Sequence, residues 1–207
     1  MKKPILVSLV FALFVSAPPS LADDDEENAL KDPSFELALS VEQGGWETFG
    51  TTFFSPDQAR KGKMSFFTGA LGFNGAGSTQ MFPASPGSQW RMTGFGRITE
   101  PLEGAGFPGL PFAIIQLTFL DADGNELGTV ETVGNEFPAL ASNFITTGSP
   151  VNEWIFLDTG VGTAPPGAAT IVVFTLFIGS GDFTDFQFAF FDDLNLCAIE
   201  EIVDDEI

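Results

Sequence analysis

One stretch near the C-terminus, residues 186–196, limits the folds that this chain can adopt. It is rich in aromatic residues and contains neither glycine nor proline, which predicts one strand buried on at least one face. Two adjacent carboxylates, Asp192 and Asp193, interrupt this apolar strand. Because burial of a bare carboxylate is costly, we expect the pair to lie at an edge or to hold a cation.

A further carboxylate follows an apolar residue at the other end of the domain, where Glu36 comes directly after Phe35. Three acids brought together without a cation would repel one another and would be partly desolvated. We therefore infer that the two ends of the domain meet, that the fold is one closed sandwich, and that these acids share a metal.

Strand-like runs separated by turns rich in glycine and proline fill the rest of the domain. With 23 glycines, 14 prolines and almost no helical periodicity, the chain is predicted to be an all-β, antiparallel two-sheet sandwich. Expected strands cover residues 35–39, 46–54, 63–68, 78–82, 89–98, 112–120, 126–133, 154–158, 169–178 and 186–196.

Alternation within these strands identifies the expected core. Side chains two residues apart lie on the same face of a strand, so one set should be buried. The expected core comprises Trp90, Met92, Leu117, Phe119, Ile171, Val173, Leu194 and Leu196. Most of the 24 phenylalanines are also expected to fill the core.

Both ends of the chain are expected to lie outside the folded domain. Residues 1–22 combine a basic start, a short apolar run and small residues before Asp23, which is typical of a secretory signal peptide. Residues 23–31 form an acidic N-terminal tail, residues 32–199 the sandwich domain, and residues 200–207 an acidic C-terminal tail. The expected location is therefore outside the cytoplasm, either extracellular or periplasmic.

The strongly negative net charge of the chain disfavours two classes of partner. The formal net charge of −20 argues against nucleic acid, since phosphate binding needs clustered Lys and Arg, and it argues against anionic membranes. Cys197 is the single cysteine; a buried thiol at the end of a strand is favoured over a disulfide between two chains.

Catalysis is disfavoured by the residue types that the chain contains. It has no His and no Tyr, so no imidazole is present to activate Cys197. A zinc site is also not expected, because the chain has no His and one Cys, and these are the usual zinc ligands. Carboxylate-based glycoside hydrolysis is compatible with the composition, but nothing in the sequence marks one acid as desolvated in a cleft. We therefore expect no catalytic residues and no enzyme activity.

Several short motifs, in this order, resemble those of the secreted jelly-roll carbohydrate-binding modules found beside xylanases, which are of the galactose-binding-domain-like type. The resemblance covers about residues 28–197 and implies a jelly-roll sandwich. The motifs are DPSFE at 32–36, GW at 45–46, ARKGKMS at 59–65, PGSQWRM at 86–92, LTFLDADGN at 117–125, APPGAA at 164–169 and FDDL at 191–194.

This resemblance also implies a structural calcium ion. Its expected ligands are Glu36, the backbone carbonyl of Lys63, and Asp193, with Asp192 as the other candidate. Hard oxygen ligands of this type suit Ca²⁺. The alternative is that both aspartates are solvated or paired with Arg60. Residues 121–125 also imitate a calcium loop, but Thr132 stands where the twelfth-position acid belongs, so a plain β-turn is favoured.

The same resemblance implies that a polysaccharide or other glycan is a candidate partner. A sugar-binding face would need exposed aromatic and polar groups together. We expect it opposite Trp90, provided that the two central strands present their side chains on one surface. Its expected lining residues are Arg91, Phe95, Arg97, Gln116 and Thr118. A solvated outer sheet face is the alternative. The sequence thus predicts a non-catalytic carbohydrate-binding protein, or else an extracellular surface or matrix interaction protein on the same fold.

Overall fold

A computed structural model describes residues 27–72, 74–104, 111–132, 134–135, 138–180 and 185–199. The expected signal peptide, residues 1–22, and the expected C-terminal tail, residues 200–207, lie outside the described residues. Within the described residues, no helix is long and apolar enough to span a bilayer.

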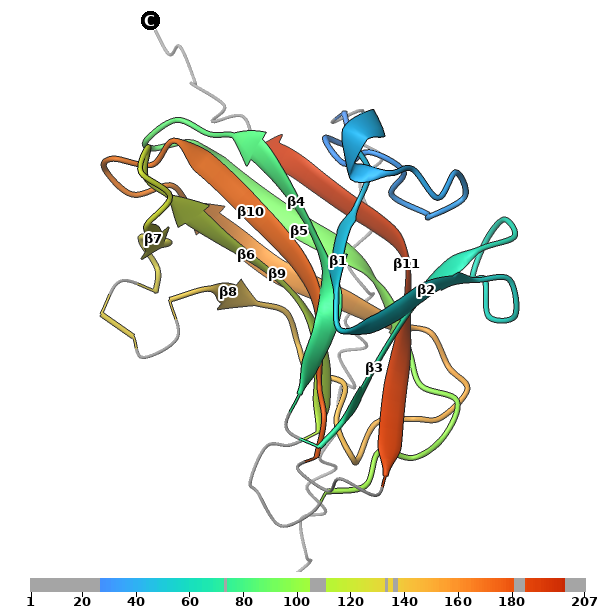
Figure 1. Ribbon diagram of the computed structural model, residues 1–207. Coiled ribbons are helices and arrows are strands. Elements are labelled where there is room, and N and C mark those ends of the chain that lie inside the picture. The colour runs from blue at the N-terminus through green and yellow to red at the C-terminus, as the bar shows by residue number, and fades with distance from the viewer. Residues whose placement is uncertain are drawn as a thin grey trace, which may run out of the picture.

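Two antiparallel sheets make up the domain, which confirms the predicted two-sheet jelly-roll sandwich (Figure 1). Sheet A has the strand order β1 (Glu47–Phe49), β4 (Gly75–Pro83), β10 (Thr170–Ile178), β6 (Phe112–Leu120) and β7 (Glu126–Gly128), with β8 (Leu140–Ala141) beside β6. Sheet B has the order β2 (Thr51–Ser55), β3 (Ser65–Leu71), β11 (Phe186–Ile199), β5 (Gln89–Arg97) and β9 (Ile155–Thr163). A short 3-10 helix, η1 (Val41–Gln43), precedes β1.

The core lies between the sheets and follows the predicted alternation. Along β5 the residues Met92, Gly94 and Gly96 are buried, while their neighbours in sequence are partly exposed. Seven of the eight expected core residues are buried: Met92, Leu117, Phe119, Ile171, Val173, Leu194 and Leu196. Trp90 is the exception, because it is only partly buried and packs against the edge of the core.

Residues 46–54 do not form the single strand that was predicted. Gly50 adopts a φ of +70°, and a Cβ there would lie 2.6 Å from the Cβ of Ala76. At this glycine the chain leaves sheet A after β1 and enters sheet B as β2 (Figure 1). This crossing joins one edge of sheet A to one edge of sheet B.

The predicted strand at residues 35–39 is wrong, because this segment forms turns. Asp32, Phe35 and Ala38 have φ values of 50°, 59° and 48°, which a strand does not allow. The Asp32 carboxylate accepts a hydrogen bond from the backbone N–H of Leu37 at 3.0 Å. These turns direct the Phe35 ring into the core, where it stacks on Phe66 at a centroid distance of 5.1 Å.

The N-terminal segment runs beside the last strand, so the two ends of the domain meet as predicted. Backbone hydrogen bonds join Ala29 N to Leu196 O at 2.8 Å and Leu194 N to Pro33 O at 3.0 Å. Leu30 is buried in the core. The packed domain therefore begins near residue 28, although residues 28–31 were assigned to the acidic tail.

Other strand limits differ from the predicted ones where glycine ends a strand or pairing extends it. The strand expected at 126–133 ends at Gly128, whose φ is +73°. The strand expected at 154–158 continues as β9 to Thr163 because it pairs with β5 along its length. Residues 121–125 form the expected plain turn, in which Asp121 accepts hydrogen bonds from the backbone N–H groups of Asp123 and Asn125.

Candidate functional site

Aromatic side chains gather on the outer face of sheet B, the face turned away from the core. Strand register places Phe53 of β2 opposite Phe67 of β3, Phe67 opposite Phe190 of β11, and Phe190 opposite Arg97 of β5. These four residues form one row across the sheet, which we call the aromatic row.

The rings of this row are in direct contact. Phe53 and Phe67 are stacked, with centroids 4.1 Å apart and an interplanar angle of 15°. Phe186 and Phe188, from the start of β11, lie beside Phe67, with ring centroids 6.3 Å and 5.2 Å from it. We call the five rings of Phe53, Phe67, Phe186, Phe188 and Phe190 the aromatic cluster. Phe53 is 50% exposed and Phe186 is 42% exposed, so the cluster presents apolar surface to solvent.

A second row crosses the same face beside the first. Register places Asp192 opposite Phe95 and Phe95 opposite Phe156. The two rings meet edge to face at a centroid distance of 5.4 Å. The guanidinium carbon of Arg60 lies 3.4 Å from the Phe95 ring centroid, so the loop between β2 and β3 partly covers this row.

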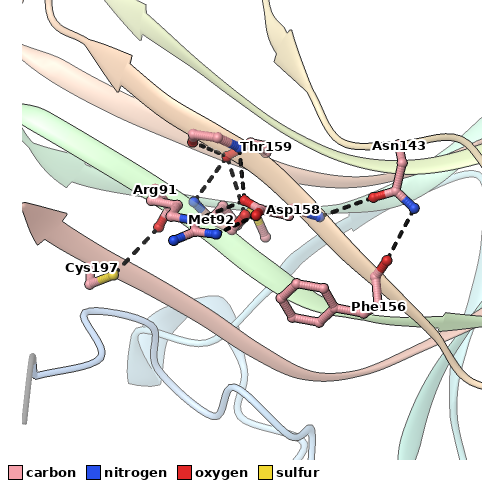
Figure 2. A network of polar contacts seen from close by, with 8 residues as sticks. Arg91, Met92, Asn143, Phe156, Asp158, Thr159 and Cys197 are labelled. Carbon is pink, nitrogen blue, oxygen red and sulfur yellow. Dashed lines mark hydrogen bonds and ion pairs between the residues drawn. The ribbon is translucent and has the colours of Figure 1, made fainter. Parts of the chain in front are cut away.

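Arg91 lies further along the face, in a fixed ion pair (Figure 2). Its guanidinium binds both carboxylate oxygens of Asp158, with Nε donating to Oδ1 at 2.9 Å. The hydrogen bond from Arg91 holds the pKa of Asp158 below its usual range, and the same bond raises the pKa of Arg91. Asn143 braces this segment by binding the backbone at Phe156 and Asp158. Arg91 is therefore already committed to a carboxylate within the protein.

Cys197 of β11 lies opposite Arg91 of β5, with its Sγ 3.8 Å from the Arg91 carbonyl oxygen (Figure 2). Its side chain is buried. The structure thus places this cysteine at the end of the last strand, in the position expected of a packed thiol.

The structure does not bring together the five expected sugar-binding residues. Arg91, Phe95 and Arg97 share the outer face of sheet B, but Gln116 and Thr118 lie on β6 of sheet A. These two point away from the core because Leu117 between them is buried. The condition that both strands present one surface is therefore not met, and Gln116 and Thr118 belong to the opposite side of the sandwich.

Sequence reasoning missed the phenylalanines of the aromatic cluster because it assigned most phenylalanines to the core. A signal was available in the last strand, where Phe186, Phe188 and Phe190 occupy alternate positions. Since Ala189 and Phe191 take the other face and pack in the core, these phenylalanines must face outward.

Asp192 lies beneath the β2–β3 loop and is 0% exposed. Its Oδ2 accepts a hydrogen bond from Arg60 N at 2.7 Å, and its Oδ1 accepts one from Asp193 N at 2.8 Å. Desolvation is the largest influence on this carboxyl and outweighs these bonds, raising the pKa of Asp192 to about 6. A bulge in β11 between Asp192 and Asn195 breaks the regular pairing here.

Glu36 binds the same loop from its other side. Its Oε1 accepts hydrogen bonds from Lys63 N at 2.7 Å and Met64 N at 2.9 Å. These two bonds, with Met64 contributing most, lower the pKa of Glu36. Gly62 has a φ of +69° and approaches the carboxylate so closely that a Cβ there would clash with Oε1.

Asp193 forms an ion pair with the Arg60 guanidinium, which is the alternative considered for this residue. The expected metal ligands Glu36, Asp192 and Asp193 thus all contact the loop at residues 60–64. They do so through N–H donors, and in the described part of the chain no three acidic, His or Cys side chains form a group able to hold a metal. The oxygens have the chemistry that calcium prefers, but an ion would have to compete with these donors.

No protein-family model matches the sequence, and no curated protein matches it. Solved structures do match the fold. The C-terminal family 22 carbohydrate-binding module of Clostridium thermocellum Xyn10B is 16% identical, with 82% of this chain aligned to 94% of the module at a TM-score of 0.50.

Two longer proteins contain a similar domain. The enzymatically active domain of bacteriophage CBA120 tailspike protein 4 is 16% identical, with 83% of this chain aligned and a TM-score of 0.55. The arabinose-bound MgGH51 α-L-arabinofuranosidase is 11% identical, with 84% aligned and a TM-score of 0.55. This chain spans 21% and 26% of their lengths. Together these matches show that the chain has the fold of β-sandwich carbohydrate-binding modules.

The raised pKa of Asp192 predicts a specific pH dependence of stability in the presence of chelator. The ordinary value is 3.8 and the folded value about 6, so the folded state binds the proton more tightly. The contribution of Asp192 to the free energy of unfolding is therefore largest below pH ~4 and falls by roughly 2–4 kcal/mol as the pH rises through ~6. Asp192→Asn should remove this decline.

Urea unfolding of both proteins at about pH 4 and pH 7 measures the effect. The difference in free energy of unfolding, wild type minus Asp192→Asn, should be smaller at pH 7. Comparing two proteins cancels the titration of all other acids. An equal difference at both pH values would show that Asp192 titrates normally.

Proposed function

We propose that this protein is a secreted, non-catalytic carbohydrate-binding sandwich whose ligand lies on the outer face of sheet B. The observation that carries the proposal is the aromatic cluster there, with Phe53 and Phe186 exposed and with Arg97 on the same face, opposite Phe190. Sugar rings have apolar C–H faces and a polar rim, so they bind where aromatic and polar groups meet on one surface. The shared fold with a family 22 carbohydrate-binding module supports this class of ligand.

The absence of catalysis is part of the proposal. A glycoside hydrolase needs two accessible carboxyls, one of them with a raised pKa. Asp192 has a raised pKa, but it is fully buried beneath the loop at residues 60–64. Asp158 and Asp193 on this side are already paired with arginines. Export is supported by the signal-peptide pattern of residues 1–22.

One feature favours the second candidate, an extracellular surface or matrix interaction protein that binds no sugar. Phe53 stacks face to face on Phe67, so these rings use part of their faces on each other. Phenylalanine also lacks the hydroxyl of Tyr and the indole N–H of Trp, which form hydrogen bonds with polar ligands. A protein partner would bury this apolar surface without needing hydrogen bonds from the rings.

Substitution of the exposed phenylalanines tests the sugar-binding face. Phe53→Ala and Phe186→Ala should each weaken binding to a polysaccharide that retains the wild type. The expected loss is about tenfold, or about 1.4 kcal/mol, because each substitution removes an exposed apolar contact. Affinity electrophoresis through gels containing a panel of soluble polysaccharides measures the loss. Both residues are half-exposed, so folding should be little affected.

Met81→Ala is the matched control, since Met81 is 57% exposed and lies on β4 of sheet A. Its retention should equal that of the wild type. If all three variants are retained as strongly as the wild type, the aromatic cluster is not part of the binding site. A wild-type protein that no polysaccharide retains would favour the second candidate function.

We also propose a structural calcium ion held by Glu36, Asp193, the Lys63 carbonyl and, as the further candidate, Asp192. Support comes from the contacts that Glu36, Asp192 and Asp193 each make with the loop between β2 and β3. An ion there would tie the N-terminal segment, this loop and β11 together. It would also replace Arg60 as the partner of Asp193.

Calcium should raise the melting temperature if it binds the folded state. The gain follows RT ln(1 + [Ca]/Kd), or about 2.7 kcal/mol at about 100 times Kd. Thermal melts with chelator and with millimolar calcium measure the shift, and elemental analysis detects an ion too tightly bound to remove. Glu36→Gln and Asp193→Asn should abolish most of the shift, whereas Asp123→Asn, in the distant turn, should retain it. Equal melting temperatures with chelator and with calcium, together with no metal by elemental analysis, would reject the site.

A further inference from the structure

Arg97 differs from the other two arginines of the chain. Arg60 is paired with Asp193 and Arg91 with Asp158. Among the residues that the structure describes, Arg97 has no carboxylate partner; its Nη2 donates to the amide oxygen of Asn152 at 3.2 Å. A guanidinium has five N–H donors in a planar fork, so most of its binding capacity is unused.

The surroundings of Arg97 make its unpaired N–H donors energetically unfavourable. Its Nε is buried and has no partner among the described residues. Its guanidinium carbon lies 5.9 Å from the Trp154 ring centroid, and Phe190 is its neighbour on β11. Loss of water around a cationic donor is unfavourable unless an anion or acceptor replaces that water. Because the buried Nε is closed to solvent, an external acceptor would bind at the Nη groups of the guanidinium.

Most charged side chains on this face are paired with one another, whereas the whole protein has a large excess of acids. The chain carries a formal net charge of −20. On the outer face of sheet B, however, Asp158 is paired with Arg91 of β5 and Asp193 with Arg60 of the β2–β3 loop. Asp192 is buried beneath that loop. Arg97 is thus the arginine of this face without an acid partner in the described structure, and a ligand with a negative group fits there.

We propose that the outer face of sheet B binds a glycan that contains uronic acid, with the sugar carboxylate held by the Arg97 guanidinium beside Trp154. This inference rests on the proposed function and specifies its ligand class. A carboxylate is planar and matches the guanidinium fork with two parallel hydrogen bonds. Trp154 is partly exposed and offers apolar surface to the sugar ring next to that carboxylate.

Affinity electrophoresis tests the inference with polygalacturonate, alginate and glucuronoxylan, each beside its carboxyl-reduced neutral form, and with dextran sulfate. The wild type should be retained by at least one uronate polymer and at least about tenfold more weakly by its reduced form, as expected for loss of a charge-assisted pair. Arg97→Gln should bind the native polymer no better than the wild type binds the reduced one. Arg97→Lys should recover only part of the affinity, because it keeps the charge and loses the fork.

Lys31→Gln is the matched control, because it removes one positive charge from an exposed residue whose backbone binds Gln80 of sheet A. It should bind as the wild type does. Equal retention by native and reduced polymers would overturn the uronate inference and leave sugar binding standing. Retention by dextran sulfate alone would overturn it as well. No retention by any polymer, reduced forms included, would overturn both this inference and the proposed function. Since the carboxyl-reduction arm uses the wild-type protein, the test does not depend on the folding of a variant.

Discussion

The contact between the N-terminal segment and β11 is the constraint on which the rest of the structure depends. Backbone hydrogen bonds from Ala29 and Leu194 join the two ends of the domain. The Phe35 ring then enters the core, where it stacks on Phe66 and contacts Trp46 at a tilted angle. Because β11 is the middle strand of sheet B, this closure fixes the strand on which β3 and β5 both pair (Figure 1).

β11 also connects the core to the candidate binding face. Ala189 and Phe191 face inward and are fully buried, whereas Phe186 and Phe188 face outward into the aromatic cluster. The inward side chains hold the strand in place, so the outward ones are presented on a rigid sheet rather than on a loop. A preorganised surface loses little conformational entropy when a ligand binds, which suits recognition without catalysis.

Sequence alone predicted the sandwich, the meeting of its ends and seven of the eight core residues, because alternation reports which side of a strand is buried. Alternation does not report which sheet a strand joins, and for that reason Gln116 was grouped with Arg97 although they lie on different sheets. The turns around Phe35 were missed because residues 35–39 are mostly apolar, like a short strand, and nothing in the sequence marks the positive φ of Phe35 and Ala38. The pairing of Asp192 with loop N–H groups depends on a contact between residues 132 positions apart.

The central claim is that ligand binding occurs on the outer face of sheet B. Chemical-shift mapping by NMR, during titration with oligosaccharides from whichever polysaccharide retains the protein, locates the contact directly. The account predicts shifts in the resonances of Phe53, Phe186 and Arg97, with those of Met81 and Gln116 on sheet A unchanged. Shifts confined to sheet A, or to loops away from the aromatic cluster, would contradict it.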